Sequence, residues 1–293
     1  MENKSNNIKV LAGIVTFNSD PNRLYENVKA VYPQVEKLVI FDNGSKNISD
    51  LKKSLTKFNN IKYIESPDNK GIAAALSEIM NYAIKNKYDW VLTLDDDSVV
   101  SEKLIDEYKK FTNIKNIGTM TCRMEDRNYN MNFKEVAGDF EYVDRCITSG
   151  CFMSVEAYKN SDGYSVDFFI DRVDDDICYN FTQHGYKHIL INYMGLMHEM
   201  GQGIEKKFLW HTARAVNYSP MRRYYIFRNE TIVRNKYPNL IKKEWLESGR
   251  PMWINFALSS LKIVLYEDNK KEKIKQSWKG WKDGRIYVKE KFS

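Results

Sequence analysis

Residues 90–97 read Trp90-Val91-Leu92-Thr93-Leu94-Asp95-Asp96-Asp97, an apolar run that ends in three consecutive carboxylates. The run predicts a buried strand, because strands covered on both faces are apolar throughout. Three adjacent negative charges repel one another, and a hard divalent cation with oxygen ligands relieves that repulsion. Successive strand residues point to opposite faces, so we expect Asp95 and Asp97 to share one Mg²⁺ or Mn²⁺. The alternative is a solvated acidic turn before a helix, with Ser101 as N-cap.

The segment before this strand alternates between strand and helix patterns. Asp20-Pro21 supplies an N-cap followed by proline at the first helical position. Apolar strands are predicted at 8–16, 38–41 and 61–65, and helices at 21–32, 49–58 and 72–84. Apolar strands separated by helices predict an α/β fold with a mostly parallel central sheet flanked by helices.

Ligands of such sheets bind beyond the carboxyl ends of the strands. Each of the four predicted strands is followed by a polar cluster, at 16–18, 42–44, 68–71 and 95–97. The helix that starts after Lys70-Gly71 suits a diphosphate, because unpaired backbone N–H groups and the helix dipole favour anions. Asp42 can accept a hydrogen bond from the N–H edge of a base. The alternative is that the Asp-Asn and Asn-Gly sequences are turns.

Past residue 122 the pattern becomes mixed. Residues 123–142 are polar and predict a long active-site loop, and 145–153 return to strand character across Ser149-Gly150. A second acidic cluster, 174–176, opens a predicted helix behind an apolar segment. The helix dipole accounts for one or two of these carboxylates, and the third suggests a base buried in a cleft. His198 is a lone histidine, which is more often structural, although beside a D-x-D pair it is a candidate metal ligand.

The bulk composition indicates a globular protein. The chain has 293 residues, of which 43% are hydrophobic, and a net charge of +6 that is concentrated after residue 206. This asymmetry predicts an acidic partner such as nucleotide phosphates, anionic lipid headgroups or nucleic acid, and the alternative is a solvated lysine-rich surface. The four cysteines lack C-x-x-C spacing and predict reduced, buried thiols. A polar start without a signal-peptide pattern predicts a cytoplasmic protein.

The C-terminal part contains an apolar stretch, 253–266, that is shorter than the roughly 20 residues of a membrane-spanning helix. Two interpretations remain, a helix that packs in the core or in a homo-oligomer, and an amphipathic helix on the surface. Trp278 and Trp281, with lysines around them, suit a headgroup boundary where a lipid-linked acceptor is delivered.

Several short motifs, taken in order, resemble the family 2 glycosyltransferases of the GT-A fold, and more narrowly their bacterial rhamnosyltransferase and galactofuranosyltransferase branch. The resemblance covers nearly the whole chain. The motifs that carry it are Val15-Thr16-Phe17-Asn18, Asp42-Asn43-Gly44-Ser45, Asn69-Lys70-Gly71-Ile72-Ala73, Leu94 to Asp97, Ser149-Gly150, Phe169 to Asp174, Gly185-Tyr186, His198 with Gly201, and Arg222 to Asn229.

This resemblance implies an inverting, metal-dependent transfer of a sugar from a nucleoside diphosphate donor to a hydroxyl of a growing cell-surface glycan. It implies Mn²⁺ or Mg²⁺ held by Asp95, Asp97 and His198. The donor would contact Thr16, Asn18, Asp42, Asn69, Lys70, Gly71, Asp95 and Asp96. Acceptor contacts would come from Ser149, Gly150 and Asp176. Asp174 or Asp175 would be the general base, because family members often carry Glu-Asp where this chain has Val173-Asp174.

The resemblance also implies partners and a division of the chain. The first candidate donors are dTDP-rhamnose and UDP-galactofuranose, and the acceptor is a glycan or a lipid-linked glycan. Peripheral contact with the inner face of the cell membrane and a homo-oligomer through the C-terminal region are further expectations. Residues 1–215 would form the catalytic domain, with a nucleotide half at 1–122 and an acceptor half at 123–215, and 216–293 a helical extension.

Two other functional classes compete with this interpretation. A nucleotidyltransferase or metal phosphohydrolase needs a glycine-rich phosphate loop near the first strand, and residues 11–18 contain only Gly13. A basic nucleic-acid-binding protein could stack bases on the tyrosines between Arg222 and Arg234. Two acidic clusters would repel phosphate unless metal were bound, so no nucleic acid is expected.

Overall fold

The protein is described from a computed structural model, which covers residues 8–126, 136–198, 204–208, 211–215, 217–241 and 250–292; the side chains of 126, 198, 204–208 and 211–215 lie outside that description. The chain forms two compact units, one of residues 1–169 and 173–200 and the other of 170–172 and 201–293. Their boundary differs from the predicted division at 215/216, because residues 204–215 and the short segment 170–172 group with the second unit.

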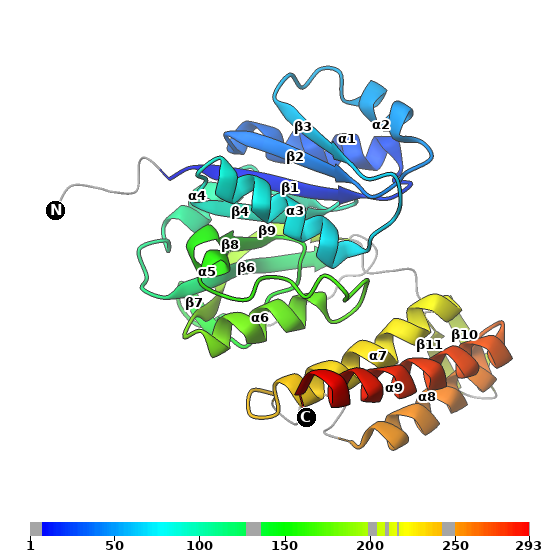
Figure 1. Cartoon of the computed structure of the whole chain (residues 1–293). Coiled ribbons are helices and arrows are strands. Elements are labelled where there is room, and N and C mark those ends of the chain that lie inside the picture. The colour runs from blue at the N-terminus through cyan, green and yellow to red at the C-terminus, as the bar shows by residue number, and fades with distance from the viewer. Residues whose placement is uncertain are drawn as a thin grey trace. The chain divides into compact units, whose positions relative to one another are not determined.

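The first unit is built on a mixed sheet with the order β3-β2-β1-β4-β8-β6-β9-β5 and with β7 paired to β9 (Figure 1). Strands β1 to β4 are mutually parallel, as predicted, and β6 is parallel to β9. The remaining pairs are antiparallel, so the parallel character is confined mainly to the nucleotide half. The strands are β1 (Val10–Thr16), β2 (Lys37–Asp42), β3 (Ile61–Glu65), β4 (Trp90–Asp95), β5 (Val99–Val100), β6 (Ile117–Asp126), β7 (Phe140–Val143), β8 (Cys151–Ser154) and β9 (Lys187–His198).

Local sequence accounts for where the helices begin. Asp20 caps α1 by accepting hydrogen bonds from the N–H groups of Asn22 and Arg23, with Pro21 at the first helical position. The helices of this unit are α1 (Pro21–Val31), the 3₁₀ helix η2 (Tyr32–Gln34), α2 (Ile48–Ser54), α3 (Ile72–Lys85), α4 (Leu104–Lys109), α5 (Val155–Lys159) and α6 (Val173–Gln183).

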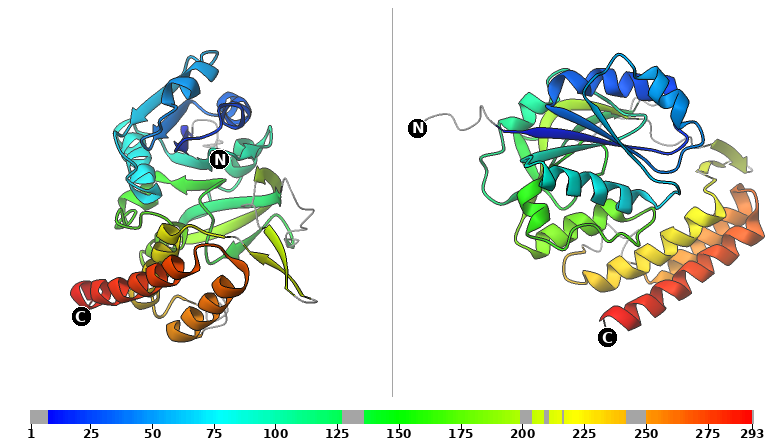
Figure 2. Two further views of the ribbon diagram at one scale, coloured as in Figure 1. Left: turned by 90° about the vertical axis from the view of Figure 1, so that its right-hand side faces the viewer. Right: turned by 45° about the horizontal axis from the view of Figure 1, so that its top comes forward.

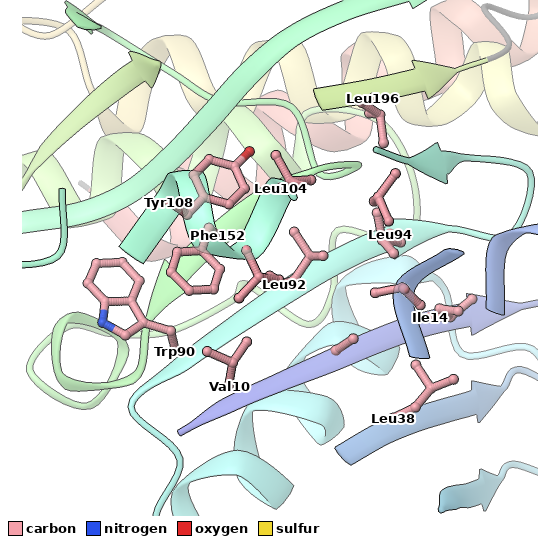
Figure 3. Close-up of a cluster of buried hydrophobic side chains, with 14 of the residues drawn as sticks. Val10, Ile14, Leu38, Trp90, Leu92, Leu94, Leu104, Tyr108, Phe152 and Leu196 are labelled. Carbon is pink, nitrogen blue, oxygen red and sulfur yellow. The ribbon is translucent and has the colours of Figure 1, made fainter. Parts of the chain in front are cut away.

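Strand alternation divides the core between the two faces of the sheet. Residues at alternate positions, such as Val10, Ile14 and Leu92, join one buried cluster with apolar residues of α1, α2 and α4. Trp90, Phe152 and Tyr108 stack in this cluster, with ring centroids 4.9 and 5.0 Å apart (Figure 3). On the opposite face, α3 packs on β1 so closely that a Cβ on Gly13 would lie 2.5 Å from Ile79. Gly13 therefore serves helix–sheet packing.

Two local predictions and one alternative are wrong. The strand predicted at 145–153 begins only at Cys151, because Gly150 has a φ of 77° and breaks the extended run. The predicted loop at 123–142 is partly strand, since β6 continues to Asp126 and β7 begins at Phe140. The strand β5 follows the acidic triplet, so α4 begins at Leu104 and Ser101 is not its N-cap.

The second unit consists of the hairpin β10 (Ile204–Phe208) and β11 (His211–Ala215) with the helices α7 (Pro220–Lys236), α8 (Met252–Tyr266) and α9 (Lys270–Phe292). Helices α7 and α9 pack side by side, as both views in Figure 2 show. A Cβ on Gly280 or Gly284 would lie 2.1 Å from the carbonyl oxygen of Tyr224 or 2.7 Å from that of Arg228. The two glycines therefore allow the backbones of α7 and α9 to approach.

The segment 170–172 is bound by α7. The Asn229 amide donates to the carbonyl oxygens of Ile170 and Asp171 at 2.9 and 3.0 Å. The carboxylate of Asp171 pairs with Arg222 at 3.1 Å, and Arg172 pairs with Glu230 at 2.5 Å. Asp171 and Arg172 have φ values of 65° and 64°, a left-handed conformation that aspartate tolerates and that arginine rarely adopts. These interactions hold a backbone turn that the chain would not adopt by local preference.

The prediction of buried, reduced thiols is confirmed. All four cysteines are free and buried. Among the described helices, none is both long and apolar enough to cross a membrane.

Candidate active site

The predicted donor residues gather where three parallel strands end. Thr16 and Asp42 are register partners at the ends of β1 and β2, and Val15 is paired with Asp95 at the end of β4. The Thr16 hydroxyl donates to Asp42 Oδ1 at 3.0 Å, and the Ser45 N–H donates to Oδ2 at 2.9 Å. Thr16 and Asp42 are buried, so Asp42 is a fixed acceptor rather than a mobile surface carboxylate.

Asn18 lies beside this pair in an exposed turn. Its backbone has a φ of 52°, which asparagine tolerates better than most residues. The Asn18 N–H donates to Ser45 Oγ at 2.8 Å, and its side-chain oxygen accepts from the Lys46 N–H at 2.9 Å. The turns after β1 and β2 are therefore joined to each other through Asn18 and Ser45.

The start of α3 differs from the prediction. The N–H groups of Lys70, Gly71 and Ile72 already donate to Asn43 Oδ1, Asn69 Oδ1 and the carbonyl of Phe169, at 2.8, 2.9 and 2.7 Å. The expected diphosphate cradle of unpaired N–H groups is thus wrong for these three, and the exposed Lys70 ammonium is what remains for an anion.

Asn43 is a structural residue that the sequence interpretation missed. It is buried, and its amide donates to the Gly71 carbonyl at 3.1 Å while its oxygen accepts from Lys70. Gly71 has a φ of 85°, and a Cβ there would lie 2.5 Å from the Phe169 carbonyl oxygen. Its position next to Asp42 was the available signal, but a turn was an equally good explanation.

The first acidic triplet, Asp95 to Asp97, leaves the strand. β4 ends at Asp95, so the alternation that placed Asp95 and Asp97 on one face does not extend to Asp97. All three side chains are half-buried. The Ser19 hydroxyl donates to Asp96, whose pKa is raised by burial more than the Ser19 hydrogen bond lowers it. Asp95 and Asp97 remain the two candidate metal ligands.

Ser149 and Gly150 lie behind this triplet. The Asp95 N–H donates to Ser149 Oγ at 3.2 Å, and that hydroxyl donates to Ser98 Oγ at 2.7 Å. The Gly150 N–H donates to the Thr93 carbonyl at 2.9 Å, and its own carbonyl accepts from Tyr108. Both residues are buried, so their geometry supports a role in holding the end of β4 and gives no support to the expected acceptor contact.

The second acidic triplet, Asp174 to Asp176, occupies the first turn of α6. Asp175 is buried and its carboxylate pairs with Arg145 at 2.5 Å. Asp176 is 1% exposed, and the acceptor contact expected of it stays a prediction. Asp174 is half-buried, and its Oδ1 accepts from the Asp175 N–H at 3.0 Å.

Burial raises the pKa of Asp174 to about 6, and the negative charge of Asp175 adds to that rise. A carboxylate near this value is protonated often enough to exchange a proton and ionised often enough to accept one near neutral pH. Of the two candidates for the general base, Asp174 is thus favoured over the ion-paired Asp175.

The described side chains include two of the three predicted metal ligands, Asp95 and Asp97. Across the side chains that the structure describes, no three histidine, cysteine or acidic groups converge as a preformed site requires. His198 ends β9, and its side chain lies outside the described residues. Two half-buried carboxylates suit Mg²⁺ or Mn²⁺, because Mg²⁺ is commonly held by one or two carboxylates together with substrate phosphates.

Comparison with known proteins identifies the family. The sequence model of glycosyl transferase family 2 matches residues 12–149, which contain the ends of β1, β2 and β4 and the Ser149 support. The chain carries a family 2 glycosyltransferase domain. The family match and the similar transferase both favour an enzyme that transfers a sugar. They favour it over a nucleotidyltransferase or metal phosphohydrolase and over a nucleic-acid-binding protein.

Two known proteins are similar over most of the glycosyltransferase chain. A protein of Shigella flexneri named dTDP-rhamnosyl transferase RfbF is 23% identical over 78% of this chain and 81% of its own length. The crystal structure of Staphylococcus aureus TarS 1-349 is 13% identical, covers 96% of this chain and 92% of its own, and has a TM-score of 0.54. The same TarS fragment has been solved in complex with UDP-GlcNAc, with a TM-score of 0.55. These likenesses confirm the GT-A fold of the glycosyltransferase and its helical C-terminal region.

A buried histidine, His188, joins α6 to strand β6 of the sheet. His188 Nε2 lies 2.9 Å from the Cys178 carbonyl and Nδ1 lies 2.6 Å from Thr119 Oγ1. The tautomer with hydrogen on Nε2 satisfies both contacts, with the Thr119 hydroxyl donating to Nδ1. Burial lowers the pKa of His188 to about 4, so the ring is neutral at physiological pH. Sequence reasoning missed this role, because His188 precedes the apolar part of its strand without a motif.

Proposed function

We propose that this glycosyltransferase transfers a sugar from a nucleoside diphosphate donor to a hydroxyl of a cell-surface glycan, with inversion at the anomeric carbon. The observation that carries the proposal is Asp174, a half-buried carboxylate with a pKa of about 6 at the start of α6. It is the member of its triplet that combines exposure with a pKa suited to a base. An inverting transfer needs one base of this kind beside the acceptor.

In the proposed reaction, the acceptor hydroxyl attacks the anomeric carbon from the face opposite the diphosphate. The new bond joins the hydroxyl oxygen to the anomeric carbon while the bond from that carbon to the diphosphate oxygen breaks. Asp174 takes the hydroxyl proton, and the nucleoside diphosphate leaves with the electron pair. Asp175 contributes by keeping its charge beside Asp174, and Arg145 limits that effect through its ion pair with Asp175.

The donor's nucleotide is proposed to bind at the ends of β1 and β2. Asp42, fixed by Thr16 and Ser45, would accept a hydrogen bond from the base, and Asn18 would close the exposed side. Asp95 and Asp97 would hold Mn²⁺ or Mg²⁺, which when bound supplies positive charge to the diphosphate. Lys70 would add its ammonium to the same anion, because the neighbouring N–H groups are already paired.

The first candidate donor is dTDP-rhamnose, and UDP-galactofuranose is the second. The motif resemblance and the name of the Shigella flexneri relative both favour rhamnose. The proposed acceptor is a glycan or lipid-linked glycan at the inner face of the cell membrane. For the C-terminal region, self-association is the alternative to membrane contact.

The test is thermal stabilisation and slow donor hydrolysis across a panel of nucleotide sugars, each with Mn²⁺, with Mg²⁺ and with a chelator. The panel contains dTDP-rhamnose, UDP-galactofuranose, UDP-galactose, UDP-glucose, UDP-N-acetylglucosamine and GDP-mannose. We expect one donor to dominate by orders of magnitude, because a site that hydrogen-bonds specific hydroxyls discriminates strongly. A response only to a UDP-pyranose or GDP-mannose would exclude the rhamnose proposal. Responses that are equal with metal and with chelator would exclude the metal proposal.

A further inference from the structure

Helix α8 exposes a row of large apolar side chains, unlike α3 on the sheet of the first unit. Apart from Lys262, the large exposed side chains of α8 are apolar: Trp253, Leu258, Leu261, Val264 and Leu265 are 36–61% exposed. With about 3.6 residues per turn, these positions share one side of the helix. We call them the α8 outer face. A water-facing helix normally shows charged residues there, as α3 does at Glu78 and Lys85 while it buries its apolar side.

The opposite side of α8 packs within the second unit, and it carries polar groups beside the buried Ile263. Asn255 is buried, and the Ser259 hydroxyl accepts from Arg223 at 3.3 Å. Glu267, directly after the helix, is buried and pairs with Arg223 and with Lys273. Rotating α8 to bury its apolar side would break these contacts and leave charges unpaired, which is strongly unfavourable. Internal ion pairs therefore fix the outward orientation of the outer face.

A cationic groove adjoins α8 along α9. Phe256 of α8 packs against Trp278 and Trp281, with centroid distances of 5.5 and 5.9 Å. The same two tryptophans line a groove of about 360 Å³ together with Lys282, Arg285, Ile286 and Lys289. Residues 251–293 carry ten Lys and Arg against five Asp and Glu, so they account for most of the net charge of +6. Apolar and cationic surfaces thus lie next to each other in the second unit.

We propose that the α8 outer face and the α9 groove together dock on an anionic lipid bilayer. α8 would lie in the plane of the membrane, with its apolar side below the headgroups and the tryptophans at the boundary. The α9 lysines would reach anionic headgroups while their stems stay on apolar surface. A second copy is a poorer occupant, because a two-fold pairing through this surface brings two clusters of like charge together. This inference gives the proposed membrane location its surface, but vesicle binding requires no substrate and is measured independently of transfer.

The test is co-sedimentation of the full chain with vesicles of phosphatidylcholine alone and of phosphatidylcholine mixed with phosphatidylglycerol. We expect binding to the anionic vesicles at least about tenfold tighter than to the neutral ones, and weaker with rising salt. Leu261→Gln/Val264→Gln should reduce binding to anionic vesicles by about tenfold, because it removes apolar side chains from the inserted face. Lys282→Glu/Lys289→Glu should remove the preference for anionic lipid.

Two matched variants control for these changes. Val166→Gln/Met194→Gln alters exposed apolar residues of the first unit, and Lys57→Glu/Lys62→Glu makes the same charge change on its surface. Both should bind vesicles like the wild type, and circular dichroism should show that all four variants are folded. Wild-type binding that is absent from both vesicle types, or that is equally insensitive to the α8 and α9 changes, would overturn the proposal. The proposal would also be overturned if the wild type bound no vesicles and the Leu261→Gln/Val264→Gln variant had a lower oligomeric mass than the wild type. The occupant of the surface would then be a second copy of the chain.

Discussion

The protein contains two runs of three aspartates, 95–97 and 174–176, whose surroundings differ. Asp95 to Asp97 stand at a strand end, and each side chain keeps some exposure. The Asp96 carboxylate accepts from Ser19, and the Asp95 backbone N–H donates to Ser149. Asp174 to Asp176 open a helix, where one carboxylate is paired with Arg145, one is 1% exposed and one is left half-buried with a raised pKa. In the second triplet the protein supplies a cation to one carboxylate, through the ion pair of Asp175 with Arg145. The first triplet is the one for which we propose a bound metal as the source of positive charge.

The largest effect should come from Asp174→Asn. We expect transfer to fall by about 10³-fold, within the range for loss of a general base, while donor binding by calorimetry stays within twofold. The raised pKa also means that ionised Asp174 opposes folding, a cost absent below its unfolded pKa and present above about pH 6. The variant should therefore be more heat-stable than the wild type at pH 7.5. If the variant instead lost donor binding, Asp174 would be a donor-binding residue and not the general base.

The next largest effect should come from Asp97→Asn or Asp95→Asn. Each change removes one proposed carboxylate ligand, so the metal that neutralises the diphosphate is held less tightly. Metal-dependent donor binding should therefore weaken by at least about 100-fold. Asp96→Asn is the matched control in the same turn, and it should cost less because Ser19 already occupies that carboxylate. Unchanged donor affinity in the Asp97 variant would end its assignment as a ligand.

A smaller, pH-dependent effect should distinguish Asp175 from Asp174. The acidic limb of kcat/KM should have its midpoint near pH 6, because Asp174 must be ionised to accept a proton. Asp175→Asn removes the neighbouring negative charge and releases Arg145, so the limb should move to lower pH, by about one pH unit. Activity at pH 8 should survive. If it is abolished with the fold intact, Asp175 is the base.

The smallest effect on transfer, but a clear one on stability, should come from acidification around His188. Its folded pKa of about 4 lies below the unfolded value, so the unfolded chain binds a proton first as pH falls. Stability should drop between about pH 6.5 and 4, by up to about 3 kcal/mol. Urea unfolding across this range should show the loss, and His188→Gln should flatten the profile. An identical slope in that variant would remove His188 as the support of α6.

Periodicity and strand-end chemistry predicted the nucleotide half well, because they depend on neighbours in sequence. The ends of β1, β2 and β4 meet as expected, and Asp20-Pro21 starts α1. The roles of Ser149 and Asn43 could not be predicted. Each depends on a partner tens of residues away, at Asp95 and at Lys70, and no local pattern encodes such a pairing. The different surroundings of Asp174 and Asp175 likewise depended on Arg145, which lies 30 residues before Asp175 in the chain.

The left-handed turn at Asp171-Arg172 belongs to the second unit, although the residues on both sides of it in sequence belong to the first. The two units therefore do not correspond to two continuous stretches of the chain. Residues 170–172 group with the second unit, and the next residue in sequence begins the helix that carries Asp174. A chimera that exchanged only residues 201–293 for those of a relative would pair a foreign α7 with the native tripeptide. Asn229, Arg222 and Glu230 would then be lost as partners of that turn unless the relative supplied equivalents. A functional exchange must therefore carry two separate pieces of gene, one of them three codons long.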